Sequence, residues 1–80
     1  MTDREKKILA IVQRLSQVQG ANPAPDEHLF QSGILDSFGL PDLIAALETE
    51  FAISIPDSDL LPQRFATVRA IDGYLAGRAG

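Results

Sequence analysis

The most chemically suggestive residue of this chain is Ser37, which stands between Asp36 and Phe38 where a long connection meets an apolar stretch. A serine at a helix start ordinarily acts as a cap, because its hydroxyl accepts a hydrogen bond from a free backbone N–H. The same place favours a phosphate group, since the N–H groups and the helix dipole attract negative charge. Asp36 partly opposes that field, so we expect it to have another duty, such as binding a metal or base used by a modifying enzyme. Ser37 is therefore a candidate for capping and for covalent modification.

Catalysis by the chain itself is disfavoured. The lone His28 offers a base for Ser37, but Leu35 occupies the first glycine position of the Gly-x-Ser-x-Gly turn that presents such a serine. With one histidine and no cysteine, the chain has neither the usual zinc ligands nor a disulfide framework. Its 80 residues are also too few to enclose a catalytic cleft with two walls. We therefore predict one domain over residues 1–80, with no catalytic residue and no metal site.

The charge distribution favours a docking surface for a protein partner over acidic residues that merely keep a small domain soluble. The net charge is −4, and no Lys or Arg occurs between Arg14 and Arg64. That interval contains many acidic residues: Asp26, Glu27, Asp36, Asp42, Glu48, Glu50, Asp57 and Asp59. A one-signed acidic surface repels nucleic acid and anionic membranes, and it favours encounter with basic protein surfaces.

No membrane or export signal is evident in the sequence. No apolar run approaches the roughly 18 residues of a membrane span. The N-terminal stretch MTDREKKILA lacks the apolar segment and the small-residue cleavage site of a signal peptide. We expect a cytoplasmic monomer without a membrane span, and the start at Met1 with a short tail after Leu75 favours a free-standing protein.

The first predicted helix covers about residues 3–19. Thr2 and Glu5 have the spacing of a capping box at its start, and Gly20 follows its end. Its apolar residues recur at intervals of three and four: Ile8, Ile11, Val12, Leu15 and Val18. We expect the long connection that follows, residues 20–36, to be ordered, because it contains three apolar anchors: Phe30, Ile34 and Leu35.

The second predicted helix covers about residues 38–51 and is the clearest amphipathic segment. Pro41 has no N–H to donate, so we expect the regular helix to begin nearer Leu40. Gly39 and Pro41 together should leave the backbone around Ser37 loose, with fast amide exchange at residues 38–40.

The remaining predicted elements are short. We expect Ile53 and Ile55 to enter the core from a loop, and one turn of helix to follow at about residues 57–61. A last helix at about residues 67–76 is capped by Thr67. These elements predict an all-α fold, a small antiparallel four-helix bundle with three main helices and one short helix.

The stretch LDSFGLPDLIAALETEFAISIPDSDL resembles the central part of acyl carrier proteins. The shared pattern is Asp-Ser, an apolar and acidic helix ending in Leu-Glu-x-x-Phe, then Ile-x-Ile-Pro and an acidic turn. The closing FATVRAIDGYL is also similar, so the likeness covers about residues 30–75. The DSFG segment also resembles D-alanyl carrier proteins, whereas Gly39, Leu40 and Pro41 depart from the commonest family pattern.

The resemblance implies a carrier with an acyl-carrier-like fold. In this family a phosphopantetheinyl transferase moves 4′-phosphopantetheine from coenzyme A onto the motif serine, here Ser37, and the arm holds acyl groups as thioesters. The carrier presents them to acyl-loading, acyl-transfer or synthase enzymes with basic docking surfaces, in fatty acid, polyketide or related specialised pathways. Partner recognition would fall on residues near Ser37 and along the second helix: Asp36, Phe38, Leu40, Asp42 and Glu48.

Two further expectations concern the cargo and an alternative function. In such carriers an acyl chain can enter between the second helix and the loop after Phe51. The lining expected here is Leu43, Leu47, Ile55 and Ile71. The alternative is an unmodified acidic helical adaptor that docks a basic protein partner. Incubation with coenzyme A and a transferase separates the two functions, because only a carrier gains the mass of an arm.

Overall fold

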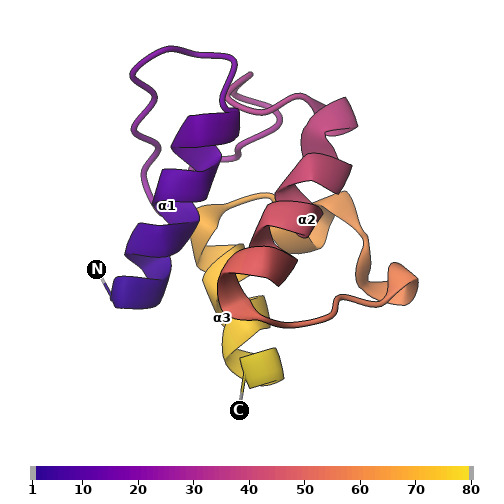
Figure 1. Cartoon of the computed structure of the whole chain (residues 1–80). Helices are drawn as coiled ribbons and strands as arrows, with labels where there is room; N and C mark the ends of the chain where they lie inside the picture. Colours follow the sequence, from indigo (N-terminus) through magenta and orange to yellow (C-terminus); the bar gives the residue numbers. More distant parts are fainter. Residues whose placement is uncertain (1, 80) are drawn as a thin grey trace.

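The computed structural model describes the backbone of residues 2–79 and, within that range, every side chain except those of Ser37 and Ala79. The described residues form helices and turns without any strand (Figure 1), so the predicted all-α fold is confirmed. The elements in chain order are α1 (Asp3–Leu15), η1 (Ser37–Gly39), α2 (Leu40–Phe51), η2 (Asp57–Asp59), η3 (Pro62–Phe65) and α3 (Val68–Ala79), where η denotes a 3₁₀ helix. None of the described helices is long and apolar enough to cross a membrane.

The predicted capping box begins α1. The Thr2 hydroxyl accepts the Glu5 N–H at 3.1 Å, and the Glu5 carboxylate accepts the Thr2 N–H at 3.0 Å. The helix ends at Leu15 rather than at residue 19, because Ser16 adopts an extended backbone and its hydroxyl accepts the Val18 N–H at 2.9 Å. Because α1 ends at Leu15, the residues that follow it can form hydrogen bonds with the long connection.

The long connection is ordered and belongs to the core. Leu29 is fully buried, and Ile34 and Leu35 are buried beside it, whereas Phe30 is only half-buried. The Leu29 N–H donates to the Ala66 carbonyl at 2.6 Å, which joins the connection to the segment before α3. The anchors predicted at residues 34 and 35 are therefore present, but the deepest one is Leu29 rather than Phe30.

Helix α2 begins at Leu40, as Pro41 predicted, and runs opposite to α1 in Figure 1. It ends at Phe51 because Ala52 adopts a left-handed conformation, with φ 53° and ψ 46°. After this turn Ile55 is buried and Ile53 is half-buried, so both contribute to the core from a loop.

The predicted short fourth helix is a pair of 3₁₀ turns. The turn η2 ends at Asp59 instead of residue 61, and η3 was not expected at all. Helix α3 begins after Thr67, whose hydroxyl accepts the Ala70 N–H at 2.9 Å, so the predicted cap is confirmed. The helix continues to Ala79, beyond the expected end at residue 76.

Polar contacts of α3 link it to other elements. Arg4 donates to the Asp72 carboxylate at 2.6 Å, which joins α1 to α3. The Tyr74 hydroxyl donates to the Asp59 carboxylate at 2.7 Å, and this contact fixes η2 against α3. Burial raises the pKa of Tyr74 above its ordinary value of 10.0, and the hydrogen bond to Asp59 raises that pKa further.

Candidate functional site

Ser37 begins η1, and α2 follows directly at Leu40. The segment lies where the long connection meets α2 at one end of the molecule (Figure 1). The neighbours Asp36 and Phe38 are both exposed, so an approaching enzyme can reach this turn from solvent. The Ser37 side chain lies outside the described part of the structure.

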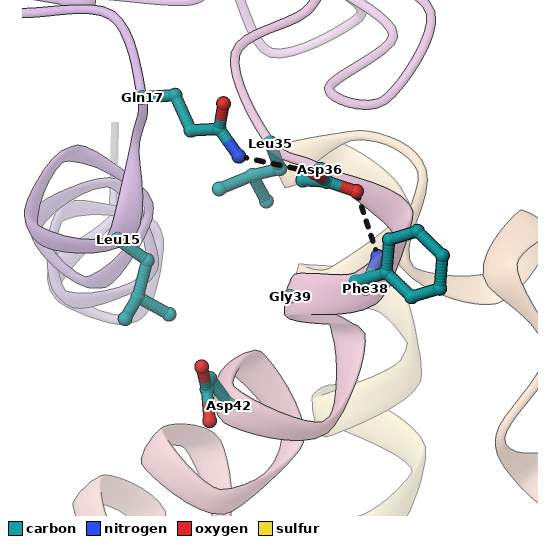
Figure 2. Close-up of a pocket in the computed structure, with 7 residues that line it drawn as sticks. All are labelled: Leu15, Gln17, Leu35, Asp36, Phe38, Gly39 and Asp42. Carbon is teal, nitrogen blue, oxygen red and sulfur yellow. Dashed lines mark hydrogen bonds between the residues drawn. The ribbon is translucent and has the colours of Figure 1, made fainter.

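Asp36 holds the turn that carries Ser37 (Figure 2). One carboxylate oxygen accepts the Phe38 N–H at 2.9 Å, and the Asp36 carbonyl accepts the Gly39 N–H at 2.8 Å. The other carboxylate oxygen accepts the Gln17 side-chain amide at 3.2 Å. The contact between the Phe38 N–H and the Asp36 carboxylate is that of an Asx turn, in which a short side chain satisfies a backbone donor two residues on. Asp36 therefore has a structural duty that the sequence did not reveal.

The backbone around Gly39 is better held than expected. Gly39 has φ −84° and ψ −2°, a conformation open to any residue. The amides of Phe38 and Gly39 both donate hydrogen bonds. These hydrogen bonds favour slower exchange at the two amides than the sequence suggested, and Pro41 does delay the start of α2; the exchange rates at residues 38–40 stay a prediction.

A pocket of about 270 Å³ adjoins this turn. Figure 2 shows it between the end of α1, the segment before η1 and the first turn of α2. Its lining mixes leucine side chains with carboxylates and an amide: Leu15, Gln17, Leu35, Asp36, Phe38, Gly39 and Asp42.

The residues expected to recognise partners have different environments. Phe38 is 89% exposed, which is unusual for a large apolar side chain. Leu40 is half-buried against the core, and Asp42 is exposed in the first turn of α2. Phe38 and Asp42 are therefore accessible to a partner beside Ser37.

Glu48 has a role within the fold. Its carboxylate accepts the Ile55 N–H at 2.8 Å, and its carbonyl accepts the Ile53 N–H at 3.2 Å. The residue is half-buried and holds the loop after α2 against the helix. From the sequence, Glu48 was expected only to take part in partner recognition, because the loop contact joins residues seven apart in the chain. Glu50, in contrast, is exposed.

The four residues expected to line an acyl pocket have different environments in the described part of the structure. Leu43, Leu47 and Ile71 are fully buried within the core. Ile55 lines a surface pocket of about 310 Å³ between α2 and η2. The other residues of that lining are Leu40, Pro41, Ile44, Ala45, Glu48, Asp57 and Leu60.

Comparison with known proteins identifies the family. The family described as phosphopantetheine attachment site matches residues 6–75, which include the turn and all of α2. The chain belongs to this family. Its members carry a covalently attached phosphopantetheine group, so the chain is a carrier rather than a catalyst. The described residues contain no cluster of three or more His, Asp or Glu that could hold a metal ion.

Relatives within the family are named D-alanyl carrier proteins. The chain is 37% identical over 67 residues to one from Streptococcus uberis, covering 84% of each chain. It is 35% identical over 69 residues to one from Streptococcus suis, covering 86% of each chain. A relative from Bacillus velezensis is 33% identical over 52 residues, which cover 65% of this chain and 67% of the relative.

Proposed function

We propose that Ser37 is the attachment point of the phosphopantetheine arm and that the arm carries a small acyl group as a thioester. The observation that supports this most is the turn that Asp36 holds, which carries Ser37 directly before α2 within the family match and whose residues Asp36 and Phe38 are exposed. Serine supplies a hydroxyl nucleophile, and the chain has no cysteine, so the thiol of the thioester must come from the arm.

The attachment reaction is proposed to use a phosphopantetheinyl transferase. The Ser37 oxygen attacks the phosphorus that bears pantetheine in coenzyme A, and a phosphodiester forms. The bond from that phosphorus to the nucleotide breaks, adenosine 3′,5′-bisphosphate leaves, and the serine proton passes to a base of the transferase. The carrier supplies only the hydroxyl and the turn that presents it.

The attachment is tested by intact-mass measurement after incubation with coenzyme A and a broad-specificity transferase. Wild type should gain one arm, and Ser37→Ala should gain none while keeping its helical circular dichroism spectrum. Ser58→Ala, an exposed serine in η2, is the matched control and should load like wild type. Loading of Ser37→Ala would show that another residue is the site, and no loading of wild type would favour the unmodified adaptor.

We favour an aminoacyl cargo over a long fatty-acyl or polyketide chain. The relatives are named for D-alanine, and the three core residues Leu43, Leu47 and Ile71 are fully buried, so a long chain would have to open the core. The test incubates the holo protein with ATP in two separate reactions: one contains D-alanine and an amino-acid-activating ligase of a D-alanyl carrier system, and the other contains hexadecanoate and a ligase that activates fatty acids. Thioester formation with D-alanine alone supports this cargo, whereas equal loading with both would contradict it.

The proposed partners are the transferase and acyl-loading and acyl-transfer enzymes with basic surfaces. Exposed Phe38 and Asp42 lie beside Ser37, and Glu50 adds negative charge farther along α2. Charge of this kind mainly speeds encounter, so Glu50→Lys should slow loading at low salt and weaken its dependence on salt. Unchanged loading at low ionic strength would refute a docking role for this residue. A cytoplasmic location and a monomeric state complete the proposal.

A further inference from the structure

The pocket beside the turn begins next to the proposed attachment point. Ser37 stands in the chain between Asp36 and Phe38, which both line the pocket. This pocket shares no lining residue with the surface pocket at Ile55. We propose that the pocket is a resting site for the neutral pantoyl part of the arm, the part closest to the phosphate. This inference rests on the proposed attachment at Ser37.

Two leucines provide an apolar wall. Leu15 comes from the last turn of α1 and is half-buried, and Leu35 comes from the segment before η1 and is 4% exposed. The pantoyl group carries two methyl groups on one carbon. Contact between these methyl groups and the leucines removes apolar surface from water, which favours the bound arm.

The polar groups of the pocket are suited to a neutral donor. Gln17 uses its amide nitrogen on Asp36, which leaves its amide oxygen as an acceptor. The Asp42 side chain points toward the pocket in Figure 2, and no hydrogen bond to it occurs among the described residues. The pantoyl hydroxyl and the adjacent amide N–H are donors that match these acceptors.

Charge selects the neutral part of the arm over the phosphate. Asp36 and Asp42 both line the pocket, and their carboxylates repel a phosphodiester. The phosphate therefore stays at the exposed side of the turn, while the uncharged pantoyl group that follows it enters the pocket.

Gly39 provides a way to close the pocket by mutation. It lines the pocket, its φ is −84°, and a Cβ atom added there would meet no atom within 4 Å. Gly39→Leu should therefore narrow the pocket without straining the backbone. Ala45→Leu is the matched control, because Ala45 is exposed on α2 and does not line this pocket.

The test is nuclear magnetic resonance of the isotopically labelled apo and holo proteins without any partner enzyme. In the holo protein, nuclear Overhauser contacts should join the pantoyl methyl protons to the methyl groups of Leu15 and Leu35. The Gln17 side-chain amide should also shift on attachment of the arm. These contacts should disappear in holo Gly39→Leu and persist in holo Ala45→Leu.

The outcomes separate this inference from the proposed function. If mass measurement finds the arm on wild type but the holo protein lacks contacts to both leucines, the resting site is refuted and the carrier function stands. Contacts of full intensity in Gly39→Leu would also refute it. If that variant does not fold, Leu15→Gln replaces it and should abolish the contacts to the Leu35 methyl groups. If no arm attaches to wild type, both proposals fail.

Discussion

Replacement of Asp36 separates its structural duty from its role in partner recognition. Asp36→Ala removes the carboxylate that accepts the Phe38 N–H at 2.9 Å and the Gln17 amide at 3.2 Å. Loss of a capping side chain of this kind costs about 1 kcal/mol. Because the turn is exposed, that cost should appear mainly as local opening, with a roughly fivefold rise in amide exchange at Phe38.

Asp36→Asn is the matched variant, because asparagine keeps a side-chain acceptor for the same N–H but loses the charge. In this variant the amide exchange rate of Phe38 should stay within about twofold of the wild-type rate, since Asn and Asp are similar caps. If the charge also guides the transferase, loading should slow in both variants while exchange rises only in Asp36→Ala. Hydrogen exchange by nuclear magnetic resonance and loading rates by mass measurement supply the two readouts. Unchanged exchange at Phe38 in Asp36→Ala would refute the structural duty assigned to Asp36.

Three further predictions concern stability. Glu48→Ala leaves the Ile55 N–H without its 2.8 Å acceptor and should lower the free energy of unfolding by about 1 kcal/mol. Glu48→Gln keeps an acceptor oxygen and should retain most of that free energy. Equal losses for the two variants in urea titrations would contradict a stabilising role of this hydrogen bond. Gly39→Ala should raise the free energy of unfolding by about 0.4–1 kcal/mol, because the backbone at this position suits alanine and the added Cβ meets open space. A lower free energy of unfolding in the same titrations would show strain at this turn. The pKa of Tyr74 is raised in the folded state, so its contribution to stability is present below the ordinary tyrosine value of 10.0 and is lost as pH rises above it. Tyr74→Phe should remove this part of the fall in the free energy of unfolding at high pH. Parallel curves of unfolding free energy against pH for wild type and Tyr74→Phe would refute the contribution of Tyr74.

Features decided by neighbouring residues were predictable from the sequence. The capping box at Thr2 and Glu5, the cap at Thr67 and the delayed start of α2 at Pro41 all depend on residues within one helical turn. The position of Ser37 before an amphipathic helix was visible for the same reason.

Features that depend on distant parts of the chain were not predictable. The Gln17 contact to Asp36 joins residues 19 apart, and it requires α1 to end early. The choice of Leu29 rather than Phe30 as the deepest anchor depends on the contact with Ala66. Hydrophobic periodicity carries no information on such pairings, which arise only when the elements pack.

Peptide mapping determines directly whether the arm is attached to Ser37. The full chain is co-expressed with a phosphopantetheinyl transferase, purified and digested, and its peptides are fragmented in a mass spectrometer. If the arm is attached to Ser37, its mass will be found only on the peptide that contains Ser37 and will be released from it with the phosphate on fragmentation. Detection of the arm on a peptide that contains another serine and lacks Ser37 would rule out Ser37 as the attachment point.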